Sequence, residues 1–128
     1  MSTDIKTIAI KLLSTTTVSL AAAAATTLYT VPAGFKLRIS HVDIEIGADA
    51  STSELTIGRS TALTDFLDTQ TLSSLDAALD VGRLMPIPNA TTVKQKSYAA
   101  GVIIQVDVTT GSGGATNYFY LYGTLDAV

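Results

Sequence analysis

Alternation of apolar and polar residues is the feature that most limits the fold of this chain, and it is clearest between Leu28 and Ile46. The short apolar run that begins at Leu28 leads into Pro-Ala-Gly at residues 32–34, a turn signal in which proline fixes φ. From Phe35 to Ile39, every second residue is apolar, which is the period of a β-strand. The segment therefore predicts a β-hairpin.

The alternation slips by one residue in the second strand of this segment. Leu37 and Ile39 set one phase, and Val42 and Ile44 set the other, so the slip falls at Ser40–His41. A shift of one residue turns the following side chains to the opposite face of a sheet. We expect either a β-bulge or a change of sheet at this point, and strands that change sheets form the corners of β-sandwiches.

The C-terminal part of the chain gives a second strong β-signal. Residues 102–108 alternate, and the glycine-rich residues 111–114 predict the flexible tip of a hairpin whose return strand runs from Asn117 to about Leu125. Arg83–Asn89 contains two prolines, which predicts an edge segment because proline cannot donate a hydrogen bond into a central ladder.

The middle of the chain is less regular. Leu63, Phe66 and Leu67 have helical spacing, and residues 73–82 could form a capped turn that ends at Gly82. We interpret this region as one or two short helical turns in a long connection, with irregular strands as the alternative.

These signals together predict an all-β protein. We expect residues 1–128 to form a single domain, an antiparallel β-sandwich or jelly roll with the short helical turns in its central connection. Residues 1–12 are expected to form an extended arm or an edge strand. A chain of this length can bury about two-thirds of its unfolded surface without disulfides or metals.

Composition excludes several classes of function. Charged residues are only 15% and hydrophobic residues 47% of the chain, which indicates surface that is covered by partners. The net charge is −3 and no run of Lys or Arg occurs, so we expect no nucleic-acid partner. No segment approaches the roughly 20 apolar residues of a membrane span. Residues 12–25 resemble a secretory signal, but their threonines and the preceding Asp4 argue against cleavage.

One polar constellation could carry chemistry. His41, Asp43 and Glu45 occupy alternate positions and would project from one face of a strand, where they could ligate a metal or act in acid–base catalysis. The solvated face of a half-buried strand is the simpler interpretation, because the chain has a single histidine, no cysteine and no G-x-S-x-G nucleophile motif. We therefore expect no enzyme activity, and no catalytic, cofactor or metal site.

A row of tyrosines is the best candidate for binding. Tyr118, Tyr120 and Tyr122 line one face of the last strand, while apolar residues line the other. The row is open to three interpretations: core packing, a self-assembly interface, or a carbohydrate surface, with the interface ahead of the carbohydrate. The candidate partner-interface residues are Ile5, Ile8, Ile10, Tyr118, Tyr120 and Tyr122.

The stretch LYTVPAGFKLRISHVDIEI, residues 28–46, resembles a segment of small β-sandwich structural proteins of tailed bacteriophages. Such proteins include capsid decoration (cement) proteins and some tail or fibre components. The proline-containing segment at 84–88, the passage VKQKSYAAG at 93–101 and the C-terminal strand with its tyrosines and glycine are similar to the same class.

The resemblance implies a virion protein, and the size of the chain favours a head decoration protein. Such a protein would be a jelly-roll homotrimer on the capsid surface, would be assembled in the host cytoplasm, and would bind the major capsid protein, with residues 1–12 reaching onto it. One alternative is a tail or fibre component that holds host saccharide with Tyr118, Tyr120 and Tyr122. Another is a jelly-roll metalloenzyme that uses His41, Asp43 and Glu45.

Overall fold

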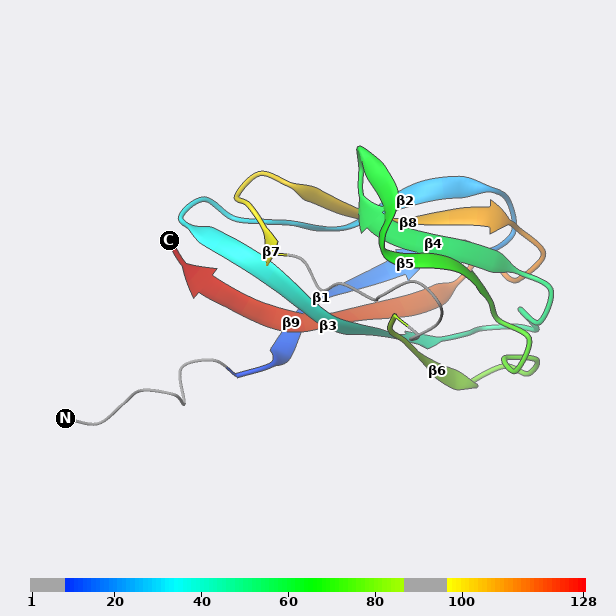
Figure 1. The fold of residues 1–128 in the computed structure, drawn as a ribbon. Helices are drawn as coiled ribbons and strands as arrows, with labels where there is room; N and C mark the ends of the chain where they lie inside the picture. The colour runs from blue at the N-terminus through cyan, green and yellow to red at the C-terminus, as the bar shows by residue number, and fades with distance from the viewer. Residues whose placement is uncertain (1–8, 87–96) are drawn as a thin grey trace.

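The computed structural model describes residues 9–86 and 97–128, and within these ranges it contains nine strands and no helix (Figure 1). The strands are β1 (Lys11–Val18), β2 (Ala24–Thr30), β3 (Phe35–Glu45), β4 (Glu54–Arg59), β5 (Ala62–Thr71), β6 (Val81–Leu84), β7 (Ser97–Tyr98), β8 (Ile103–Thr110) and β9 (Asn117–Ala127). The prediction of an all-β chain is confirmed.

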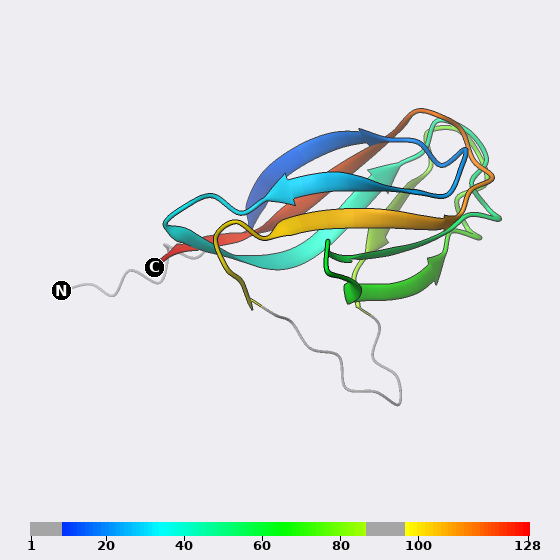
Figure 2. The same cartoon turned by 90° about the horizontal axis from the view of Figure 1, so that it is seen from above.

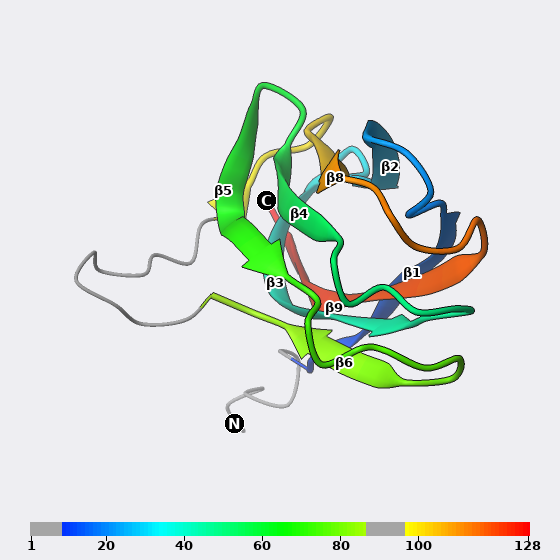
Figure 3. The ribbon, with the colours of Figure 1, turned by 90° about the vertical axis from the view of Figure 1, so that its right-hand side faces the viewer.

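The strands form two antiparallel sheets that enclose the core. The larger sheet has the order β1-β9-β3-β6, with β7 also paired to β3, and the smaller sheet has the order β2-β8-β4-β5. Figures 2 and 3 show these two layers from above and from the side. The expected edge position of Arg83–Asn89 is confirmed for Arg83 and Leu84, which lie in β6 at one side of the larger sheet, whereas residues 87–89 lie outside the described ranges.

Both predicted hairpins are wrong, because each turn carries the chain from one sheet to the other. The turn at residues 32–34 forms, and the Phe35 amide donates to the Pro32 carbonyl at 3.3 Å, but β2 pairs with β8 whereas β3 pairs with β9. The glycine-rich residues 111–114 likewise connect β8 of the smaller sheet to β9 of the larger. Local turn chemistry predicts a reversal of the chain but does not specify which sheet the next strand joins.

The predicted helical turns in the central connection are also wrong. Leu63, Phe66 and Leu67 lie in β5, an irregular strand whose pairing with β4 changes register twice. These irregularities allow the consecutive residues Phe66 and Leu67 both to be buried, which gives the sequence its helix-like spacing. Residues 73–80 form turns, in which the Asp80 carboxylate accepts hydrogen bonds from the amides of Asp76 and Ala77.

The phase slip in β3 is a β-bulge. Ile39 pairs with Gly123 and His41 pairs with Tyr122, which leaves Ser40 as the extra residue. The strand stays in the larger sheet on both sides of the bulge, so the alternative of a sandwich corner is wrong. Because the bulge adds one residue, it restores the inward phase instead of reversing it, and Ile39 and Val42 both face the core.

The core lies between the two sheets and is built from alternate residues of each. Its fully buried side chains include Leu37, Ile39 and Ile44 of β3, Phe119 and Leu121 of β9, and Leu55, Ile57 and Ile104 of the smaller sheet. Burial of each such side chain contributes about 1.5–3 kcal/mol relative to exposure. Because side chains alternate along each strand, the residues between these buried positions point away from the core, to the other face of the larger sheet.

Candidate functional site: the outer face of the larger sheet

The tyrosine row and the histidine–carboxylate row, which are far apart in the sequence, lie side by side on the solvent-facing side of the larger sheet. The antiparallel register pairs them one to one: His41 with Tyr122, Asp43 with Tyr120, and Glu45 with Tyr118. This pairing depends on the bulge. Because Ser40 is the extra residue, the histidine–carboxylate row that follows it points to the same side of the sheet as the tyrosine row. The structure thus unites two candidates that the sequence presented separately.

Strands β1 and β6 extend this surface on both sides. Thr15 and Thr17 of β1 pair with Tyr120 and Tyr118, and Arg83 of β6 pairs with Asp43. We call the whole surface the outer face. It comprises Leu12, Thr15, Thr17, Lys36, Arg38, His41, Asp43, Glu45, Val81, Arg83, Tyr118, Tyr120, Tyr122, Thr124 and Asp126.

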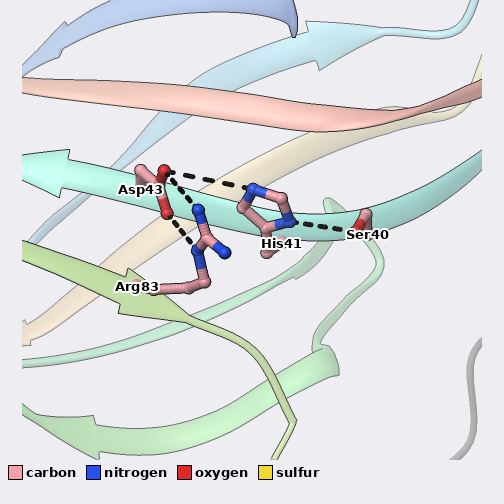
Figure 4. A network of polar contacts seen from close by, with 4 residues as sticks. All are labelled: Ser40, His41, Asp43 and Arg83. Atoms are coloured by element: carbon pink, nitrogen blue, oxygen red, sulfur yellow. Dashed lines mark hydrogen bonds and ion pairs between the residues drawn. The ribbon is translucent and has the colours of Figure 1, made fainter. Parts of the chain in front are cut away.

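A polar network occupies the region around the bulge (Figure 4). The guanidinium of Arg83 binds the Asp43 carboxylate through two bonds, Nε to Oδ1 at 2.9 Å and a terminal nitrogen to Oδ2 at 3.2 Å. His41 Nδ1 lies 2.9 Å from Ser40 Oγ, and its Nε2 lies 4.0 Å from Asp43 Oδ2. The imidazole stacks on Tyr122 with ring centroids 4.7 Å apart. The network therefore fixes the side chains at the centre of the outer face.

The surroundings of His41 favour its neutral form. Burial lowers the pKa of the imidazole below its ordinary value of 6.5, and the positive charge of Arg83 lowers it further, while Asp43 acts in the opposite direction. At neutral pH the ring is therefore an uncharged aromatic surface, continuous with Tyr122.

The geometry bears on the two chemical interpretations of the histidine–carboxylate row. Ser40, His41 and Asp43 are neighbours, but the 4.0 Å separation of imidazole and carboxylate exceeds hydrogen-bond distance, and both Asp43 oxygens are bound to Arg83. The cluster thus lacks the His–Asp hydrogen bond that orients the base of a hydrolase triad. Among residues 9–86 and 97–128, no group of three or more His, Cys, Asp or Glu side chains is placed to hold a metal ion.

Exposed apolar side chains border the network. Val81 is 63% exposed, Leu12 48% and Tyr118 40%, whereas Tyr120 and Tyr122 are half-buried. Tyrosine and arginine anchors with apolar neighbours are the composition that is enriched in protein interfaces. Of the isoleucines expected to belong to an interface, Ile10 is 60% exposed just before β1, and Ile5 and Ile8 lie outside the described residues.

Sequence reasoning missed the contributions of Arg83 and Lys36 to this surface. The sequence indicates Arg83 only as part of an edge segment, and its carboxylate partner is 40 residues away. Lys36 follows the turn at residues 32–34 and gave no signal of its own. The alternation of β6 is sufficient to place Arg83 on an outward position. It does not show that β6 pairs with β3, because the pairing of strands depends on the topology.

The comparisons with known proteins give one match. No family model matches the chain, and no curated protein does. A solved structure, the cyanophage Pam1 capsid asymmetric unit, aligns with 90% of this chain and 84% of its own at 17% identity and a TM-score of 0.47. Within the described residues, no helix is long and apolar enough to span a membrane.

Proposed function

We propose that this chain is a structural protein of a tailed-bacteriophage particle, a decoration (cement) protein that binds the assembled head and bridges neighbouring copies of the major capsid protein. The observation that carries the proposal is the outer face, a broad surface of tyrosines, a bidentate arginine–carboxylate pair and exposed apolar side chains on a two-sheet body. Such a surface suits contact with another protein. The phage context comes from the resemblance of residues 28–46.

The strand order supports the jelly-roll part of the proposal. With the two-residue β7 set aside, the chain crosses between the sheets of order β1-β9-β3-β6 and β2-β8-β4-β5 at every connection except that between β4 and β5. Only one consecutive pair of the described strands, β4 and β5, is hydrogen-bonded as neighbours. Two sheets wound in this interleaved way are the arrangement of a jelly roll.

The proposed role is thermodynamic. A protein that binds the assembled shell but not its separated subunits stabilises the shell by mass action, without any chemical reaction. The resemblance implies that the protein acts as a trimer on the capsid surface, and the N-terminal arm through Leu12 is a candidate for contact with the capsid protein. The first described part of that arm, with Ile10 and Leu12 exposed, presents apolar groups for such a contact.

The test uses expanded phage heads that lack this protein. We expect the purified chain to bind such heads saturably and to raise the temperature at which they disassemble, as measured by co-sedimentation and calorimetry. Unassembled major capsid protein should not bind. A purified chain that leaves the heads unbound and their disassembly temperature unchanged would contradict the proposal.

A tail or fibre component that binds host saccharide is the second candidate, favoured by the position of Tyr118 beside hydrogen-bonding groups of β1 and β3. Aromatic rings with neighbouring polar groups are suited to stack on and bind sugars. Glycan-array binding by a chain that ignores empty heads would favour this candidate. Binding to heads without any glycan signal would remove it.

A further inference from the structure

The charges on the outer face are separated along β3. Lys36 and Glu45 lie near opposite ends of this 11-residue strand, roughly 30 Å apart at the rise of a β-strand. The other charged side chains of the face are paired within the chain, Arg38 with Asp126 and Arg83 with Asp43. Among the described residues, no ion-pair partner of Lys36 or Glu45 is present. Asp126 is also the register partner of Lys36, so Lys36, Arg38 and Asp126 together leave one end with a net charge of +1. At the other end, Glu45 lies beside the Arg83–Asp43 pair and leaves a net charge of −1.

The region between these ends is neutral and aromatic. The stacked rings of His41 and Tyr122 lie near the middle of the β3–β9 pair, and Leu12 is the register partner of Tyr122 on the other side. The lowered pKa of His41 keeps this region uncharged at neutral pH. A surface with opposite charges at its ends and a neutral centre is complementary to itself when it is turned end over end.

We infer that the outer face binds the outer face of a second copy of this chain, about a two-fold axis that crosses β3 and β9 near His41 and Tyr122. In this arrangement the β3 strands are antiparallel, and Lys36 of each copy meets Glu45 of the other. The parallel arrangement would instead place Lys36 against Lys36 and Glu45 against Glu45. Since like charges that face each other across an interface repel, the charge pattern selects the antiparallel contact.

Both the shape and the charge of the molecule favour a second copy as the occupant. Sheets pack face to face with their strands within about 30° of each other, so a sheet is a natural partner for this face. The chain carries a net charge of −3, which disfavours association of two copies through most surfaces. On the outer face, positive and negative charges are arranged so that two copies attract each other there in spite of their net charge. The contact also covers the exposed Leu12, Tyr118 and Val81.

The inference rests on the proposed function in treating the outer face as a protein interface, and it assigns that face to a second copy, so that the head is bound through the remaining surfaces of the pair. A two-fold contact through the outer face is compatible with three-fold contacts through other surfaces. An assembly that uses both kinds of contact has an even number of chains. Because the contact is measured without heads, its failure leaves the head-binding test intact, and failure of head binding leaves the two-fold contact intact.

The experiment is a charge exchange followed by analytical ultracentrifugation at low salt. Lys36→Glu and Glu45→Lys each create a self-repelling face, and we expect each to weaken association about tenfold or more and to halve the mass of the main species. An equimolar mixture of the two variants restores both cross-pairs and should return to the wild-type mass, as should the double variant. Glu54→Lys, an equal charge change on β4 of the smaller sheet, is the matched control and should leave the mass unchanged.

Two outcomes overturn the inference. One is a wild-type chain whose mass is not twice that of the single variants. The other is a pair of single variants that do not associate when mixed, although each has the wild-type thermal unfolding transition.

Discussion

Among single residues, Asn117 is the buried polar side chain that connects the ends of neighbouring strands through hydrogen bonds. Its side chain is fully buried, and its amide nitrogen donates to the carbonyls of Val18 and Gly114, both at 2.9 Å. Its side-chain oxygen accepts from the amide of Gly47 at 3.0 Å. Val18 ends β1, Gly114 precedes β9 and Gly47 follows β3, so one side chain satisfies backbone groups at the ends of three segments.

We predict that Asn117→Ala lowers the free energy of unfolding by about 2–4 kcal/mol, because it leaves buried donors and acceptors without partners. Urea unfolding followed by circular dichroism measures the change. Gln105→Ala removes an exposed side-chain hydrogen bond to Thr27 and is the control, with an expected loss below about 0.5 kcal/mol. Equal losses in the two variants would contradict this account of Asn117.

His41 predicts how stability depends on pH. Its pKa in the folded chain lies below the 6.5 of an unfolded histidine, so protons bind the unfolded state more tightly. The stabilisation is complete above pH 6.5 and is lost as the pH falls through the folded-state pKa. The urea midpoint of the wild type should therefore fall between pH 7 and pH 5, and that of His41→Gln should fall less. A variant with the same or a steeper decline would refute the assignment.

At the scale of elements, β3 shows what a bulge does to a sequence pattern. The alternation predicted a strand here and located the irregularity at Ser40–His41. It did not decide between a bulge and a change of sheet, because that choice depends on the partner strand. In β5 the same kind of irregularity leaves the consecutive residues Phe66 and Leu67 both buried, which gives the sequence the spacing of a helix. Periodicity is therefore informative only where the ladder is regular.

The bulge leads to a prediction about deletions. Deletion of Ser40 removes the extra residue and leaves an unbroken alternation in which Ile39 and Val42 still face the core, so this variant should fold cooperatively. Deletion of Arg38 shortens the strand by the same amount but turns either Leu37 or Ile39 outward. Since the exposed Arg38–Asp126 pair is itself worth at most about 1 kcal/mol, a large loss must come from the change of phase.

Urea unfolding of the two deletion variants measures this difference. The expected result is a cooperative transition for the Ser40 deletion and a loss of more than about 3 kcal/mol for the Arg38 deletion, comparable to removal of a large core side chain. If both variants unfolded alike, the bulge would not be the origin of the phase slip.

At the scale of the whole molecule, the fold class and the core were predictable, while the topology and the assembled surface were not. The inward positions Ile104, Val106 and Val108 follow directly from alternation, and all are buried. The crossings between sheets at residues 32–34 and 111–114 could not be predicted from the sequence. The same turn residues are suitable whether the next strand joins the sheet of the preceding strand or the opposite sheet. The pairing of Glu45 with Tyr118 depends on those crossings, so the outer face emerged only from the structure.

We propose that this chain acts by binding an assembled protein shell, and the number of copies bound per head is the decisive measurement. Quantitative gel analysis of heads reconstituted with the purified chain gives this number at saturation. We expect a fixed stoichiometry close to the number of symmetry-equivalent capsid sites, together with greater resistance of the shell to disassembly. Binding of only a few copies per particle, or none, would contradict it.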